Sequence, residues 1–174
     1  MSKPLVFDPK KWHSCQNHDW QKCALNANCY SYVLNRPDYF WAVPGMGFVK
    51  AEAKKYVEGF NNYFKDVSLT EYRNEIIQGA VRDGLVQTRE LVDRDGFYLV
   101  ALFFAHNTHD FHWYRKDDDG SWSHKDGWHT ASNQDNDGNL LKEPTKETLS
   151  PYSIFGGFFL VPREGVNLKQ NLDL

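Results

Sequence analysis

The sequence predicts an α+β fold in which N-terminal helices pack on an antiparallel β-sheet. Two helical patterns occur in the first half of the chain, at 51–65 and 69–82, and the strong strand patterns follow them. Helices followed by a run of strands are typical of the α+β class, since alternating units would indicate a parallel sheet. With 174 residues and no internal repeat, the chain has the size of one domain, so we expect a single domain over 1–174.

The composition argues against several classes of protein. The net charge is −3 and charged residues make up 25% of the chain, so a nucleic-acid partner is not expected. The longest apolar run, YLVALFFA at 98–105, has the length of a strand, so no membrane span is expected either. Aromatic residues reach 16%. Such a density fills a core or lines a binding surface.

The first 47 residues predict an arm, a short helix and a loop. Residues 1–20 show no periodicity and are expected to form an extended arm. Apolar residues at helical spacing predict a short helix over 28–34, with Asn26 or Asn28 as its N-cap. The segment 37–47 contains two prolines and two glycines, which favour a loop.

The two longer helices are marked by their ends as well as their periodicity. The segment 51–65 carries aromatic residues along one side. Ser68, three residues before Glu71, matches a capping box for the helix over 69–82, and Gly84 follows its end.

The second half of the chain predicts antiparallel strands. Runs of β-forming residues are separated by turns rich in Asp and Gly, and a Gly156-Gly157 pair in the last strand predicts a bulge. The expected strands cover 97–106, 110–116, 121–125 and 152–161, with a long surface loop over 126–148.

The cysteines and the N-terminus bear on localisation. Cys15, Cys23 and Cys29 cannot all pair within one chain, and the N-terminus lacks the apolar region of a secretory signal. These features favour a reducing compartment with a free thiol, and we expect a cytoplasmic location or export without a Sec signal. A Cys15–Cys23 disulfide with Cys29 free is the alternative.

The hairpin at 110–125 predicts a pair of histidines. A turn centred on Asp118 places His112 opposite His124 and Tyr114 opposite Trp122, all on one face. Directly opposed residues in an antiparallel pair lie about 4.5–5.5 Å apart at Cβ. The two imidazoles are therefore expected to form a hydrogen bond. A register shift of one residue would destroy this pairing.

Cys29 supplies a nucleophile for these histidines. At a helix N-terminus, free N–H groups and the helix dipole favour a thiolate and lower the thiol pKa. We expect His112 to act as the general base and His124 to orient it, in the manner of a catalytic triad.

The stretch NCYSYVLN at 28–35, the Pro44-Gly45 pair and HWYRKDDDGSWSHKDG at 112–127 resemble papain-like cysteine peptidases. The similarity is greatest to their small bacterial NlpC/P60 and CHAP branches, including toxin-associated domains. This resemblance implies a papain-like fold with catalytic Cys29, His112 and His124. Position 23 holds Cys where papain-type enzymes place an oxyanion-hole Gln, so an amide of Asn26 or Asn28 is expected to take that role.

The predicted function is therefore that of a cysteine hydrolase or acyltransferase acting on an amide bond, with transfer and deamidation left open. Its expected partner is a peptide or protein, including a peptidoglycan peptide, and an effector delivered to another cell fits the leaderless chain. No cofactor is expected. The residues expected to form the oxyanion hole or substrate site are Asn28, Asn26, Tyr30, Trp113 and Trp122.

Alternative interpretations of the same residues do not involve catalysis. The chain is then an aromatic-rich module that binds a glycan or a peptide. Free cysteines are often simply buried, so a core position is the alternative interpretation of Cys29. A zinc site formed by Cys15, His18, Cys23 and Cys29 matches no standard spacing, and the acidic turn at 117–119 lacks EF-hand spacing. No metal site is therefore predicted.

Overall fold

The computed structural model describes residues 5–12, 27–49, 53–91, 94–127, 129–144 and 151–170. Most of the predicted arm over 1–20 lies outside these residues. So do Cys15, His18, Cys23 and Asn26, and with them the alternative disulfide, the zinc alternative and one of the two predicted N-caps.

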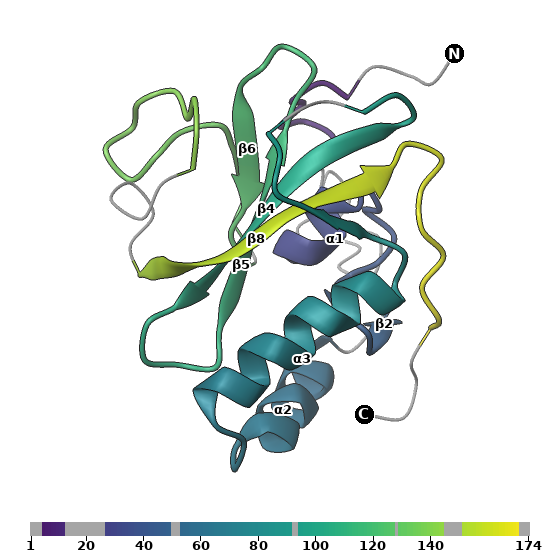
Figure 1. Cartoon of the computed structure of the whole chain (residues 1–174), viewed down its shortest axis with the longest axis vertical. Helices are drawn as coiled ribbons and strands as arrows, with labels where there is room; N and C mark the ends of the chain where they lie inside the picture. The colour runs from purple at the N-terminus through teal and green to yellow at the C-terminus, as the bar shows by residue number, and fades with distance from the viewer. Residues whose placement is uncertain are drawn as a thin grey trace.

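The molecule is organised around a six-stranded antiparallel sheet (Figure 1). Its central strand is β4 (Phe97–Ala105), an almost wholly buried run that pairs with β8 on one side and β5 on the other. The spatial order is β3-β8-β4-β5-β6-β7. The remaining strands are β3 (Val86–Thr88), β5 (Phe111–Lys116), β6 (Trp122–Lys125), β7 (Ala131–Ser132) and β8 (Tyr152–Pro162).

A second, two-stranded sheet occupies the segment for which the sequence predicts a loop. β1 (Trp41–Val43) and β2 (Gly47–Val49) form an antiparallel hairpin. Gly45 and Gly47 adopt φ values of 75° and 86°, a region that glycine enters without steric cost. The loop prediction over 37–47 is therefore wrong in part, because Pro44 and Gly45 form the turn of a hairpin whose second strand begins at Gly47.

The helices match their predicted positions closely. α1 (Cys29–Val33) is capped by Asn28, whose side chain accepts a hydrogen bond from the Ser31 N–H. α2 (Ala53–Phe64) and α3 (Leu69–Arg82) follow, and α3 begins with the predicted capping box. α3 packs against the β1–β2 turn at Gly79, where a Cβ atom would lie 2.4 Å from the Pro44 carbonyl oxygen.

The sheet separates two clusters of buried side chains. The larger cluster joins α1, the α2–α3 pair and the small sheet to one face of the large sheet. At its centre Tyr72 of α3 packs edge-on against Phe64 of α2 and Phe104 of β4. The smaller cluster covers the other face and includes Phe103, Tyr114 and Trp122. Among the described residues, no helix combines the length and the apolar character needed to cross a membrane.

The predicted papain-like α+β fold is wrong, although the helices do pack on one face of the large sheet. The described part of the chain is mostly β, and its three helices have 5, 12 and 14 residues. Four short strands raise the β content: β1, β2, β3 and β7 contain only two or three residues each. Segments this short cannot display the alternation on which strand prediction depends.

The hairpin register differs from the prediction by two residues. Tyr114 pairs with His124 and Arg115 with Ser123, so His112 and His124 are diagonal rather than opposed. A shift of two residues leaves every side chain on its predicted face, because strand side chains alternate with a period of two. The predicted hydrogen bond between the imidazoles therefore survives the register error, with 2.9 Å between His112 Nε2 and His124 Nδ1.

The last strand carries the predicted bulge. Leu102 pairs with Gly157 and Phe103 with Phe155, which leaves Gly156 as the extra residue. A Cβ on Gly156 would lie 2.6 Å from the Phe104 ring. The segment predicted as a surface loop, 126–148, contains β7 and a bridge between Gln134 and Leu140 in its described part.

Candidate functional site

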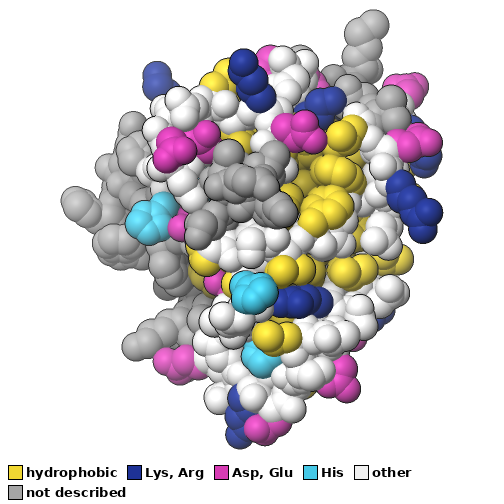
Figure 2. Space-filling model, turned by 60° about the vertical axis from the view of Figure 1, so that its left-hand side comes forward, with side chains coloured by type: hydrophobic (Ala, Val, Ile, Leu, Met, Phe, Trp, Pro, Cys, Tyr) yellow, Lys and Arg dark blue, Asp and Glu magenta, His cyan; other side chains and the backbone are white. Residues whose placement is uncertain are grey.

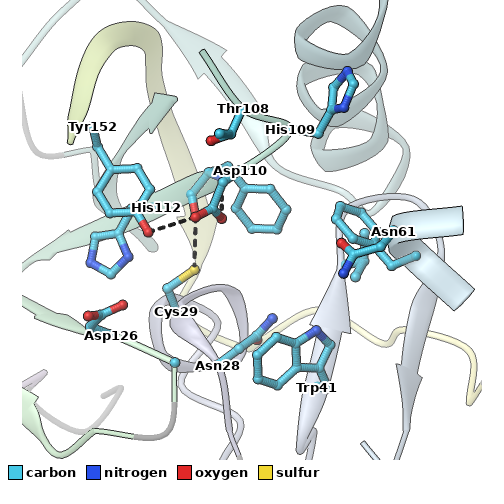
Figure 3. Close-up of a pocket in the computed structure, with 14 residues that line it drawn as sticks. Asn28, Cys29, Trp41, Asn61, Thr108, His109, Asp110, His112, Asp126 and Tyr152 are labelled. Carbon is cyan, nitrogen blue, oxygen red and sulfur yellow. Dashed lines mark hydrogen bonds between the residues drawn. The ribbon is translucent and has the colours of Figure 1, made fainter. Parts of the chain in front are cut away.

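A cavity of about 470 Å³ opens where α1, the start of β5 and the segment after β6 meet (Figure 3). This volume lies within the range of about 300–1,000 Å³ found for small-ligand sites. We call it the α1–β5 pocket. Its lining residues are Asn28, Cys29, Trp41, Val43, Phe60, Asn61, Thr108, His109, Asp110, Phe111, His112, Asp126, Gly127 and Tyr152.

Asn28 and Cys29 lie at the start of α1. The Asn28 side chain accepts from the Ser31 N–H at 3.0 Å and donates to the Ala42 carbonyl at 2.7 Å. Both ends of this amide are therefore used to hold α1 against the small sheet. The Asn28 amide nitrogen has two N–H donors and the Ala42 carbonyl takes one of them, so the predicted oxyanion role of Asn28 stays a prediction.

The Cys29 thiol is buried and neutral. Its side chain is 6% exposed, and Sγ lies 3.8 Å from the Phe111 carbonyl oxygen, to which it donates (Figure 3). Burial raises the pKa of Cys29 to about 12, and the backbone N–H of Trp113 offsets only part of that rise. The expected low thiol pKa is not found, because desolvation outweighs the dipole of a helix of only five residues.

The two histidines are also neutral. Burial lowers the pKa of His112, and the neighbouring His124 lowers it further; burial likewise lowers the pKa of His124. His124 Nε2 lies 3.1 Å from the Gln134 carbonyl oxygen, which can only accept. His124 Nδ1 is then the acceptor and His112 Nε2 the donor in the bond between them. The His112 ring also stacks on Tyr152, with centroids 4.9 Å apart.

Two carboxylates face the pocket. Asp110 accepts hydrogen bonds from the Phe111 N–H at 2.8 Å and from the Tyr152 hydroxyl at 3.0 Å (Figure 3). As a whole residue, Asp110 is exposed at the mouth of the pocket. The surrounding protein nevertheless shields the carboxylate, and this shielding raises the pKa of Asp110; the negative charge of Asp126 raises it further.

The other predicted site residues lie in the core. Tyr30 is fully buried and donates to Asp83 Oδ2 at 2.8 Å. Trp113 is also fully buried, between Tyr30 and Phe159. Trp122 belongs to the cluster on the opposite face of the sheet. These three side chains support the fold and do not line the pocket.

Sequence reasoning missed several residues that do line the pocket. Trp41 lines the pocket and lies in the aromatic-rich segment 39–48. That composition indicated a binding surface only weakly, because aromatic residues also fill cores. Asp110, Asp126 and Tyr152 come from three separate segments. The pairings of β6 with β5, of β5 with β4 and of β4 with β8 bring them together, so no local pattern could have identified all three.

The acidic turn does not form a metal site. Asp117 pairs with Arg115, Asp118 with Arg163, and Asp119 accepts from Ser121. Among the described residues, no group of three or more His, Cys, Asp or Glu side chains is arranged to hold a metal ion.

The chain is similar in sequence to a known protein of a shell matrix. It is 33% identical over 162 residues to insoluble matrix shell protein 1 of Ruditapes philippinarum, and the match covers 92% of this chain and 93% of that protein. No protein-family profile matches the chain, and no solved structure does.

This relationship overturns the predicted activity and location. The prediction of a cysteine hydrolase with Cys29, His112 and His124 as its catalytic residues is wrong, because the relative that matches nearly the whole chain is an insoluble matrix protein of a shell. The predicted location, in the cytoplasm or exported without a Sec signal as a bacterial toxin or effector, is wrong for the same reason. The motif resemblance to papain-like proteins stays a prediction, as do the predicted peptide partner and the lack of a nucleic-acid partner.

Proposed function

The chain belongs to the same family as insoluble matrix shell protein 1, and on that premise we propose that it is a non-catalytic structural protein of an insoluble matrix. The similarity over nearly the full length of both chains carries this proposal. A relationship that included only one segment would leave the role of the rest open.

The chemistry around Cys29 supports a structural role. A thiol with a pKa of about 12 is almost wholly protonated at neutral pH, and the thiolate is the nucleophilic form. The His112–His124 pair is neutral and is held by the Gln134 carbonyl and by stacking on Tyr152. The arrangement fastens α1, β5 and β6 to one another.

A matrix protein must also associate with its neighbours, and the open edge of β8 offers a way. β3 pairs only with residues 158–160 of β8. Among the described residues, none pairs with the outer edge of residues 152–157, a segment that we call the β8 edge. An open strand edge presents unpaired N–H and C=O groups to another strand.

The side chains of the β8 edge favour pairing with a second copy of the chain. The sequence YSIFGG carries no charge, so two copies would not repel each other. Phe155 is 51% exposed, and hydrophobic side chains gather on the face of the molecule that Figure 2 turns forward. Natural edges are commonly protected against such contacts by Lys, Pro or a bulge. The β8 edge has the bulge at Gly156 but neither Lys nor Pro. Antiparallel pairing of two identical edges would form a two-fold symmetric dimer.

Sedimentation of the purified chain tests the association. We expect the mean mass to rise with concentration, and Phe155→Lys to abolish the rise because two ammonium groups would meet across the paired edges. Val81→Lys is the matched control, since Val81 is 41% exposed on α3, which packs against the other face of the sheet. Equal association of the wild type and Phe155→Lys would exclude the β8 edge as the contact.

A further inference from the structure

The α1–β5 pocket combines aromatic walls with negative charge. Trp41, Phe60, Phe111 and Tyr152 supply rings, whereas Asp110 and Asp126 supply carboxylates. None of the described residues that line it is Lys or Arg. The lining also includes His109 and His112, and burial lowers the pKa of His112. The pocket is therefore a negatively charged site with apolar sides.

A buried basic side chain, that of Lys125, lies beside the pocket. Lys125 precedes Asp126 in sequence, but its ammonium donates to the main-chain carbonyls of Ala27 and Gly127, the latter at 2.6 Å. Its side chain is fully buried. Lys125 therefore stabilises the segment that carries Asp126. The negative charge of Asp126 attracts the Lys125 ammonium, but that ammonium is buried and is not exposed at the mouth of the pocket.

The carboxylates keep capacity for a ligand. An ionised carboxylate offers about four acceptor positions. Asp110 uses one on each oxygen, for the Phe111 N–H and the Tyr152 hydroxyl, and Asp126 is exposed beside the pocket. Because each Asp110 oxygen already has a partner, the group is better suited to a compact ammonium than to the two-pronged approach of a guanidinium.

The aromatic walls suit the same ligand. Trp41 is partly exposed, and the buried Phe60 adds a second ring to the lining. A ring within about 6 Å of an ammonium group attracts it, and the methylene stem of a lysine packs on apolar surface while its charged end reaches polar groups.

We propose that the α1–β5 pocket binds a lysine side chain presented by a basic partner protein, with its stem against Trp41 and its ammonium between Asp110 and Asp126. That this basic partner is itself a protein of the matrix rests on the proposed function. The pocket chemistry itself does not depend on it.

Binding of short peptides to the full chain tests the proposal. A Gly-Lys-Gly peptide blocked at both ends is titrated by calorimetry, beside versions that carry norleucine, arginine or glutamate in place of lysine. We expect the lysine peptide to bind at least about tenfold more tightly than the norleucine peptide, which keeps the stem and lacks the charge. Equal affinity of the two, no detectable binding of the lysine peptide, or tighter binding of the arginine or glutamate peptide overturns the proposal.

Substitutions inside and outside the α1–β5 pocket test whether the lysine peptide binds there. Asp126→Asn removes one charge without changing shape and is expected to weaken lysine-peptide binding by about tenfold. Asp137→Asn makes the same change at an exposed loop carboxylate outside the pocket and is expected to leave the affinity unchanged. Trp41→Ala is a second test, because it removes the ring against which the lysine stem is proposed to pack. A lysine-peptide affinity that Asp126→Asn and Trp41→Ala both leave intact overturns the assignment, provided that the thermal unfolding of each variant matches the wild type.

The outcome is separable from that of the proposed function. A chain that is retained in an insoluble matrix but does not bind the lysine peptide refutes the pocket proposal alone. A chain that binds the peptide but is recovered wholly in soluble extracts refutes the matrix role alone.

Discussion

The acidic turn after β5 and the α1–β5 pocket contain the same kind of residue in opposite situations. In the turn, Asp117 and Asp118 each pair with an arginine, and Asp119 accepts from Ser121. In the pocket, Asp110 and Asp126 face an aromatic cavity without a described Lys or Arg in its lining. The carboxylates of the turn stabilise the fold, whereas those of the pocket stay available to a partner. A sequence of Asp residues does not by itself distinguish the two.

The largest effect is expected at the buried pair of the turn. Asp117 and Arg115 have side chains 0% and 1% exposed, with 2.7 Å between Asp117 Oδ1 and Arg115 Nη2, and Asp117 also accepts from Ser123. Asp117→Asn leaves the Arg115 charge buried without a counter-ion, which costs about 3–5 kcal/mol. Urea unfolding measures this loss. Asp119→Asn, at an exposed position of the same turn, should change the free energy of unfolding by less than about 0.5 kcal/mol.

The pocket carboxylates should show the reverse behaviour. Asp126→Asn is expected to change the free energy of unfolding by less than about 0.5 kcal/mol while weakening lysine-peptide binding by about tenfold, equivalent to about 1.4 kcal/mol. Unfolding and titration of the same protein sample measure both quantities. If Asp126→Asn destabilised the fold as strongly as Asp117→Asn, the two regions would not differ as described.

The pH dependence of binding sharpens the contrast. The pKa of Asp110 is raised above its ordinary value by burial and by Asp126, so Asp110 begins to take up a proton as the pH falls from neutral, before an ordinary Asp does. Peptide affinity should therefore fall as the pH drops toward that raised pKa. Calorimetric titrations between pH 7 and pH 4 measure this change. A constant affinity across the range would exclude Asp110 as a contact.

The exposed pair of the turn should contribute less. Asp118 accepts from Arg163, and this hydrogen bond lowers the pKa of Asp118. Its contribution is present above the unfolded-state pKa of about 3.9 and is lost as the pH falls through the lower folded-state pKa. Asp118→Asn should cost about 0–1 kcal/mol at neutral pH, measured by urea unfolding, and nothing below the folded-state pKa. A cost above that of Asp117→Asn would show that burial does not decide which ion pair of the turn contributes more.

The smallest effect is expected from the thiol. With a pKa of about 12, Cys29 should react with iodoacetamide far more slowly than a free thiol at every pH from 7 to 9, as mass spectrometry of the Cys29 peptide can follow. His112→Ala should not slow the reaction, because His112 does not activate the thiol. Rapid labelling that depends on His112 would contradict the neutral site.

The helix ends and the contact between the two histidines could be predicted because they depend on residues close together in the sequence. Asn28 caps α1 and Ser68 caps α3 because capping depends on residues three positions apart. The His112–His124 contact was found despite a register error, because the face of a strand residue survives a two-residue shift.

The features that the sequence did not predict depend on contacts between residues far apart in the chain. The free-energy cost of burial around Cys29, which opposes a thiolate, comes from β5 and its neighbours rather than from α1. The pocket wall at Trp41 and Tyr152 depends on strands far apart in the chain. Short strands such as β7, with two residues, exist only because β6 offers an edge to pair with.

The most direct test of the structural role is the fate of the chain in the material that contains it. Wild type, Cys29→Ala and Phe155→Lys would be expressed with a tag in cells that deposit a matrix, and that matrix would be extracted with buffer and then with denaturant. We predict that wild type and Cys29→Ala stay in the buffer-insoluble residue, whereas Phe155→Lys moves in part to the buffer extract. Loss of Cys29→Ala from the residue, or full recovery of the wild type in buffer, would contradict a non-catalytic matrix protein.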